Sequence, residues 1–292
     1  MGLRKLGENL YLYPGSPGTL IKATSEGAVL IDPGHGKGRH KDLKREIRKL
    51  GGEIKAQLAT HSHADHVSAA PKIDAPLFTH RFEFSIAESP LNREILTFGS
   101  KAPKGFLVFQ FPDEVKVHAV FEWGDELFGF KAIQLNGHSP GMTGFVAEDS
   151  GVLYAGDSFF GERLINAVGI PYLIDPELFL SSVDRLKALA EEGFLLIPSH
   201  GKAVKGEEAL ALLELNASRI EEVEKLILSI LEKPLSMDEL AFRIMRHYGV
   251  EITPQNLALN LVPVRAFIAT LYNRGLVDVV IDNGLRWVVK RE

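Results

Sequence analysis

The sequence predicts a layered sandwich of strands and helices, followed by a small domain whose elements come in winged-helix order. Short β-like runs alternate with glycine turns and a few helical stretches as far as Lys205, a pattern typical of layered α/β architectures. Several of these runs end in a loop that bears His or Asp. After Lys205, three helical stretches precede a hairpin signal. We therefore expect a domain over residues 1–205 and a second over 206–292.

The first expected domain is rich in short strands. Turns such as Pro-Gly-Ser-Pro-Gly and Ser-Glu-Gly separate the early runs, and a charged helix over 40–50 closes at Gly51-Gly52. A second, amphipathic helix is expected over 177–191. The expected strands cover residues 10–13, 19–24, 28–31, 54–59, 115–121, 127–135, 152–155 and 194–198.

The second expected domain begins with a long helical pattern over 207–231. Ser236-Met-Asp-Glu239 forms a capping box that opens another helix, and Thr253-Pro254 opens a third with proline in its first turn. Asp282-Asn283-Gly284 then joins two β-like runs, which is a strong signal for a hairpin. Three helices followed by a hairpin are the winged-helix order.

Composition excludes several classes of protein. The 292 residues are 45% hydrophobic, enough for one sizeable core and a small second domain. The chain has no cysteine, which excludes disulfides, thiolate metal sites and a cysteine nucleophile. The N-terminal residues lack an apolar signal core and no apolar run reaches bilayer-spanning length, so we expect a cytoplasmic protein without a membrane segment.

Residues 60–66 carry the strongest chemical signal. Thr-His-Ser-His-Ala-Asp-His places four side chains that commonly bind metals within six positions, directly after an apolar run. Further His and Asp residues end other runs, and side chains at the ends of neighbouring strands meet at one edge of a sheet. The sequence therefore predicts one metal site built from seven residues: His61, His63, Asp65, His66, His138, Asp157 and His200.

The motifs resemble those of the metallo-β-lactamase superfamily of binuclear metal hydrolases over residues 8–204. The resemblance rests on the HxHxDH box at 61–66, Gly-His-Ser-Pro-Gly at 137–141, Tyr-Ala-Gly-Asp at 154–157, Pro-Ser-His-Gly at 198–201 and Asp32 in Leu-Ile-Asp-Pro-Gly. It implies an α+β fold, the αββα sandwich of that family, here with a winged-helix-like C-terminal addition.

The resemblance also implies two metal sites. One metal would be held by His61, His63 and His138, and the other by Asp65, His66 and His200. Asp157 would bridge the two metals, and Asp32 would orient the ligand loop. Imidazole and carboxylate ligands suit zinc, and iron and manganese stay open.

Two close divalent ions would lower the pKa of a shared water and leave a hydroxide as nucleophile. Asp65 would act as the catalytic residue that takes a proton during attack. Five histidines match no motif, and we interpret them as structural or exposed: His35, His40, His80, His118 and His247.

Two segments, 81–111 and 159–172, are expected to shape substrate access. The first carries Phe82, Phe84, Phe98, Phe106 and Phe109, and the second ends at Tyr172, a candidate oxyanion donor. The same phenylalanines also fit an ordinary core.

Two interpretations of the substrate remain. His63 argues against the flavin-linked iron branch of the superfamily, and the short interval between Asp157 and His200 leaves no room for a large inserted nuclease domain. The first interpretation resembles glyoxalase II and implies a small-molecule ester or thioester. The alternative resembles hydrolases with a C-terminal winged helix, some of which cut single-stranded RNA.

Charge favours the small-molecule substrate. Residues 206–292 hold ten Lys or Arg against thirteen Asp or Glu, and the whole chain has a net charge of −5, whereas a nucleic-acid-binding winged helix is usually basic. We interpret the C-terminal segment as a wall of the active site or an element of a homodimer. A non-enzymatic regulator would show broken metal ligands or a basic recognition helix, and the sequence has neither.

Overall fold

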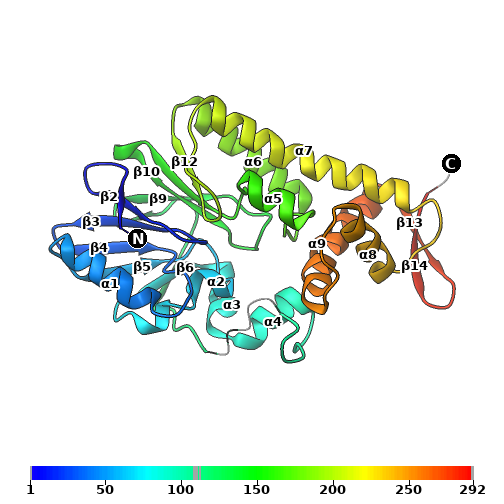
Figure 1. The fold of residues 1–292 in the computed structure, drawn as a ribbon, viewed down its shortest axis with the longest axis horizontal. Helices are drawn as coiled ribbons and strands as arrows, with labels where there is room; N and C mark the ends of the chain where they lie inside the picture. The colour runs from blue at the N-terminus through cyan, green and yellow to red at the C-terminus, as the bar shows by residue number, and fades with distance from the viewer. Residues whose placement is uncertain (1, 108–110, 112, 291–292) are drawn as a thin grey trace.

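Two mixed sheets pack face to face with helices on their outer sides (Figure 1). The computed structural model describes residues 2–107, 111 and 113–290. The first sheet has the strand order β1 (Arg4–Lys5), β2 (Leu10–Tyr13), β3 (Thr19–Thr24), β4 (Gly27–Ile31), β5 (Ile54–Leu58), β6 (Leu77–His80) and β7 (Ala119–Phe121). The second runs β12 (Leu195–Pro198), β11 (Val152–Gly156), β10 (Thr143–Ala147), β9 (Phe130–Gln134) and β8 (Glu126–Leu127).

Alternation along the strands explains the layers. On β3, Leu20 faces the second sheet, while the next residue, Ile21, packs against helix α1 (Arg39–Lys49). The other face of the second sheet packs against α6 (Pro176–Glu191) and α7 (Glu207–Ile230). The predicted αββα sandwich is therefore confirmed, with a buried layer on both faces of each sheet.

Short helices connect the strands near one edge of the sandwich. The HxHxDH loop runs into α2 (Ala64–Val67) and η1 (Ala70–Lys72). The segment after β6 contains η2 (Arg81–Glu83), α3 (Phe84–Glu88) and α4 (Pro90–Phe98). At the same edge α5 (Glu162–Val168) follows β11, whereas the turn η3 (Glu148–Ser150) links β10 to β11 at the opposite edge.

Two predicted strands are shorter than the sequence suggested. The run 127–135 is divided into β8 and β9, because Phe128 and Gly129 both have positive φ and form the tight turn of a hairpin. The run 115–121 is a strand only from Ala119, since Val115 and Val117 pack into a local cluster with Leu77 and Ala87. A short apolar run of this kind therefore does not distinguish a strand from a segment that packs into a local cluster.

The C-terminal segment follows the predicted order of elements. After α7 come α8 (Met237–His247), α9 (Pro254–Asn273) and the hairpin of β13 (Val277–Ile281) and β14 (Leu285–Val289). The predicted capping box is present, with the Ser236 hydroxyl accepting from Glu239 N. One apolar core runs from the second sheet through α6 and α7 into α8 and α9. The domain boundary near residue 205 and the winged-helix interpretation stay predictions.

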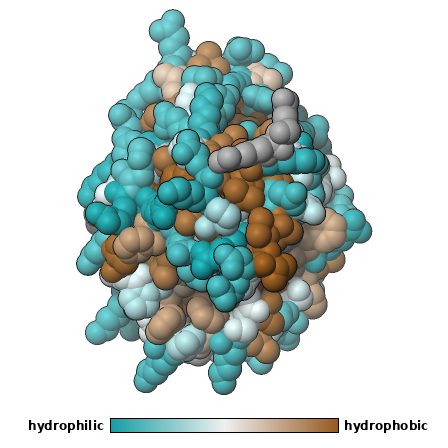
Figure 2. All heavy atoms as spheres, turned by 90° about the vertical axis from the view of Figure 1, so that its right-hand side faces the viewer, coloured by the Kyte–Doolittle hydropathy of each residue, from teal (hydrophilic) through white to brown (hydrophobic). Residues whose placement is uncertain are grey.

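The surface formed by the C-terminal elements is mixed rather than uniformly polar. Figure 2 shows apolar patches among hydrophilic side chains on this side of the molecule. Exposed apolar side chains of these elements include Phe242, Tyr272, Ile281 and Leu285. The homodimer stays a prediction. No helix within the described residues is long and apolar enough to cross a membrane.

Candidate metal centre

Loops at one edge of the sandwich bring the seven predicted residues together. The HxHxDH loop follows β5, and single residues follow β9, β11 and β12. β11 and β12 are parallel, as are β4 and β5, so their carboxyl ends lie at the same edge of each sheet. The residues that meet there are His61, His63, Asp65, His66, His138, Asp157 and His200.

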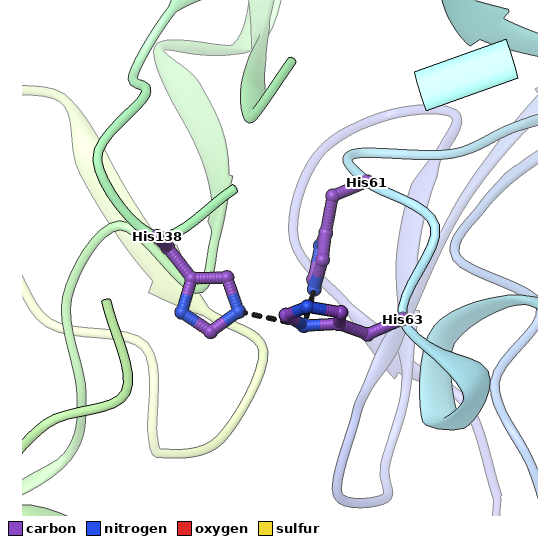
Figure 3. Close-up of side chains that lie close together, drawn as sticks. All are labelled: His61, His63 and His138. Atoms are coloured by element: carbon purple, nitrogen blue, oxygen red, sulfur yellow. Dashed lines mark hydrogen bonds between the residues drawn. The ribbon is translucent and has the colours of Figure 1, made fainter. Parts of the chain in front are cut away.

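Three imidazoles form the first group (Figure 3). His63 Nδ1 lies 3.0 Å from His61 Nε2 and 2.9 Å from His138 Nε2, so one ring lies between the other two. His61 is fully buried and His138 almost so. One loop of the first sheet and one loop of the second thus converge on a single point.

The second group lies beside the first. His200 Nε2 lies 3.3 Å from Asp65 Oδ2, and His66 Nε2 lies 3.6 Å from the same oxygen. Asp157 stands between the groups, because its Oδ2 is 3.5 Å from His138 Nε2 and 3.4 Å from His200 Nε2. Its other oxygen, Oδ1, is 3.5 Å from His66 Nε2.

The donor set fits divalent cations. His138 Nδ1 donates to the carbonyl oxygen of Tyr172 at 2.9 Å, and a carbonyl can only accept, so Nε2 of the neutral ring presents a lone pair to its neighbours. His66 Nδ1 likewise donates to the Asp32 carboxylate, at 2.7 Å. Its Nε2 and Asp157 Oδ1 are buried without a hydrogen-bond partner among the described residues. Cations between these lone pairs would satisfy them.

The two groups differ in their protonation. Burial and the neighbouring His138 lower the pKa of His63 to about 3, so this ring is neutral at physiological pH. In the second group, burial opposes the charge of His200, but Asp157 and Asp65 outweigh it and raise its pKa to about 9. Burial raises the pKa of Asp65, yet His66 and His200 bring it down to about 2. Metal binding at the second group must therefore displace protons.

Asp32 fixes the ligand loop from beneath. Its carboxylate accepts from Thr60 N and Thr60 Oγ1, both at 2.8 Å, and from His66 Nδ1. The residue is fully buried and has a φ of 54°, which is uncommon for a residue other than glycine. Strained backbone of this kind concentrates at functional sites. The contact to His66 agrees with the orienting role that the family resemblance implies.

Glu83 was not singled out in the sequence, although it links the two ligand loops. Its Oε2 accepts from Ser62 N at 2.9 Å, and its Oε1 accepts from Ser139 Oγ and Gly141 N, each at 2.8 Å. Burial raises the pKa of this carboxyl, and the three donors act in the opposite direction. Glu83 lies in an ordinary Arg-Phe-Glu stretch, so no sequence pattern marked it.

Ser16 and the Tyr172 carbonyl also position ligands. The Ser16 hydroxyl lies 2.7 Å from His200 Nδ1, and Arg39 holds its loop through the carbonyls of Pro14 and Pro17. These partners are far from the histidines in sequence, and a backbone carbonyl carries no residue signature. Only the folded chain brings them together.

Three of the five histidines that match no motif contact neighbouring residues. His80 stacks on Trp123 with ring centroids 4.1 Å apart, and His118 Nδ1 accepts from Leu77 N. His35 Nε2 lies 3.0 Å from the Ser16 carbonyl, beside the second group. His40 and His247 lie at the protein surface.

A cavity of about 320 Å³ adjoins the metal-ligand candidates. Segment 81–111 lines it through Pro90, Thr97 and other residues, whereas Phe82 and Phe84 are largely exposed. Phe109 lies outside the described residues. Tyr172 lines the cavity, and its buried hydroxyl has no hydrogen-bond partner among the described residues. Its role as an oxyanion donor stays a prediction.

Known structures share both parts of this fold. A metallo-beta-lactamase family protein from Thermus thermophilus superposes with a TM-score of 0.74 at 20% identity, over 98% of this chain and 100% of that chain. A beta-lactamase domain protein from Burkholderia ambifaria gives a TM-score of 0.69 at 17% identity, over 99% of this chain and 93% of that one. At these identities the likeness concerns the fold alone.

Two sequence relatives match most of the sandwich. The hydroxyacylglutathione hydrolase GloC of Haemophilus influenzae is 27% identical over 191 residues, 63% of this chain and 84% of that protein. The probable metallo-hydrolase YqgX of Bacillus subtilis is 28% identical over 180 residues, 59% of this chain and 79% of that protein.

A two-sheet sandwich with a His and Asp cluster at one sheet edge is the architecture of a metal-dependent hydrolase. Residues 16–200 match the metallo-beta-lactamase superfamily. The chain therefore belongs to the metallo-beta-lactamase superfamily, and the predicted family is confirmed.

Proposed function

We propose that this protein hydrolyses the ester or thioester bond of a small molecule, with two divalent metal ions as cofactors. The observation that carries the proposal is the mainly apolar cavity, which opens onto the cluster through His63, Asp65, His138, Asp157 and His200. The similarity to a hydroxyacylglutathione hydrolase supports thioester chemistry. Zinc is the first candidate, because imidazole and carboxylate ligands suit it, and iron and manganese are the alternatives.

The metals would be held by the two groups already described, with Asp157 shared between them. When bound, such metals polarise a substrate carbonyl oxygen and make a water nucleophilic at neutral pH. The side chains of His61 and His66 are fully buried and do not line the cavity, so we assign proton transfer to another residue.

Asp65 is the residue we assign to proton transfer. Its carboxylate lines the cavity, and its Oδ2 lies 3.3 Å from His200 Nε2. One oxygen of this carboxylate accepts a proton as water attacks the acyl carbon. The bond from that carbon to the oxygen or sulfur of the leaving group then breaks, and the leaving group departs with a proton as an alcohol or thiol.

A second candidate is cleavage of single-stranded RNA, which the helical C-terminal addition favours. The net charge of −3 over residues 206–292 weighs against it, because phosphate backbones are bound mainly by Lys and Arg. RNA cleavage also needs a polar groove, whereas the cavity beside the cluster is mainly apolar.

A turnover panel on the metal-loaded protein separates these functions. The panel contains p-nitrophenyl esters, S-lactoylglutathione, bis-p-nitrophenyl phosphate and single-stranded RNA. We expect turnover of the esters or the thioester, and its loss in Asp65→Asn, with Asp184→Asn on the exposed face of α6 as the matched control. Cleavage confined to RNA or the phosphodiester, and abolished by Asp65→Asn, would overturn the proposal.

A further inference from the structure

The cavity beside the cluster has one polar side and one apolar side. The polar side consists of the metal-ligand candidates, and the apolar side comes mainly from α5, α9 and the loop after Phe159, whereas α4 adds mostly polar side chains. Residues of the apolar side include Phe160, Leu164, Val168 and Leu259. A volume of about 320 Å³ is at the lower end of the range for small-ligand sites. A group that enters this side is therefore small and apolar.

Among the described residues, one cation lines the cavity apart from the cluster, and backbone carbonyls hold it in place. Arg93 and Glu94 are the charged residues that line the cavity apart from the cluster itself. The Arg93 guanidinium is buried and donates to the carbonyls of Ile86, Ala87, Phe111 and Asp113. Glu94 Oε2 accepts from Ala102 N at 2.9 Å. The carbonyl contacts occupy the two terminal nitrogens of Arg93, whereas its Nε is buried without a hydrogen-bond partner among the described residues.

The C-terminal segment completes the cavity. Leu259 on α9 lines it, although this residue lies far beyond His200 in the sequence. α9 packs against α4, and Gln255 donates to the carbonyl of Gly105 in the loop that follows α4. α9 is therefore held against α4 and the loop that follows it. These contacts fix the position of Leu259 in the cavity.

A second hollow leaves space for the rest of a substrate. It has a volume of about 840 Å³ and shares Ser16, Leu164 and His200 with the smaller cavity. The two hollows thus meet at the cluster. A molecule whose scissile bond lies at the cluster can place one end in each.

We propose that the smaller cavity is an acyl-binding pocket for short, apolar acyl groups, and that Leu259 of α9 limits their length. This inference rests on the proposed ester or thioester hydrolysis and names its substrate class. The acyl group occupies the space lined by Val168 and Leu259, and the leaving group occupies the larger hollow. The C-terminal segment is then a specificity element.

An ester series tests the length limit. The substrates are p-nitrophenyl acetate, butyrate, hexanoate and octanoate, measured as kcat/KM on the metal-loaded full chain. Leu259→Phe fills the pocket, and we expect it to lower the octanoate-to-acetate ratio at least about 10-fold, since one methylene in a pocket changes rates by about 10 to 200-fold. Leu259→Ala enlarges the pocket, and we expect it to raise that ratio.

The matched control is Leu257→Phe. This residue lies on the same helix but lines a different hollow, with Phe242 and Arg246. We expect the control to leave the chain-length profile unchanged. An identical change in Leu257→Phe and Leu259→Phe would overturn the assignment, as would a profile that no Leu259 variant alters.

A binding measurement separates failure of this inference from failure of the proposed function. Calorimetric titration with 1-hexanol needs no turnover, and we expect Leu259→Phe to weaken binding at least about 10-fold while Leu257→Phe does not. If hexanol binding is weakened by Leu259→Phe but not by Leu257→Phe, and no ester is hydrolysed, the pocket assignment is supported and the proposed reaction is contradicted. If esters are hydrolysed but hexanol does not bind, the pocket assignment is contradicted and the proposed reaction stands.

Discussion

The metal-ligand cluster and the apolar pocket lie side by side but are built in different ways. The cluster comes from strand ends of two sheets. Hydrogen bonds to Asp32, Ser16 and the Tyr172 carbonyl fix three of its rings, and Glu83 accepts hydrogen bonds from the two ligand loops. The pocket is lined by helices α4, α5 and α9, of which α5 and α9 contribute apolar side chains and α4 contributes mostly polar ones. The reaction and its specificity are therefore assigned to different kinds of element, strand-end loops and helices, which alternate along the chain.

The largest effect is expected from removing a ligand of the cluster. His138→Ala deletes one of three imidazoles in the first group, so we expect metal affinity to fall more than about 100-fold, beyond the loss usual for outer hydrogen-bond partners. Metal per chain, measured by elemental analysis after dialysis, checks this. His247→Ala, on the exposed face of α8, is the matched control. Two retained metals in His138→Ala would contradict the ligand assignment.

A smaller loss of metal is expected when the link between the ligand loops is weakened. Glu83→Gln turns an acceptor of three hydrogen bonds into a group whose amide must face at least one N–H or O–H donor. We expect metal affinity to fall about 10 to 100-fold while the chain stays folded. Competition with a chromophoric chelator measures it, with Glu221→Gln on α7 as control. Unchanged affinity would show that the ligand loops hold their positions without Glu83.

The framework of the cluster is sensitive to a single methyl group. Gly137 has a φ of 122°, and a Cβ there would overlap the backbone nitrogen of Phe179 at the start of α6. We expect Gly137→Ala to lower the free energy of unfolding by about 2 to 4 kcal/mol. Gly151→Ala is the control, because Gly151 also has a positive φ but has open space around it. Equal losses in chemical denaturation would mean that backbone strain alone matters.

The smallest effect concerns the attachment of the C-terminal segment. Arg274, at the end of α9, bonds Glu177 on α6 and Glu224 on α7. All three side chains are partly exposed, so we expect Arg274→Gln to lower the free energy of unfolding by less than about 1 kcal/mol. A loss several times larger, in the same denaturation assay, would mean that ion pairs rather than the apolar core hold α9 in place.

Much of the sandwich and all seven residues of the cluster could be predicted from the sequence. Strands that alternate between two apolar layers, and ligands placed directly after them, leave local patterns that survive without a structure. The residues that hold the ligands leave no such pattern. Ser16 reaches His200 across 184 positions, and Glu83 reaches Gly141 across 58.

The pocket was predicted only in part. The segments 81–111 and 159–172 do line it, but through Thr97, Leu164 and their neighbours rather than through Phe82 and Phe84. Leu259 was not anticipated, because a leucine in a helix is an ordinary core residue until the fold places it beside the cluster. Apolar residues carry no motif, so specificity could not be predicted from the sequence.

The separation of reaction and specificity is tested most directly by one comparison of ester profiles. We would measure kcat/KM from acetate to octanoate for the parent protein, Asp65→Asn and Leu259→Phe. We predict that Asp65→Asn lowers kcat/KM by the same factor for every ester, because Asp65 acts on the attacking water. Leu259→Phe should lower kcat/KM only for the long esters. A changed profile in Asp65→Asn, or a uniform loss in Leu259→Phe, would contradict the account.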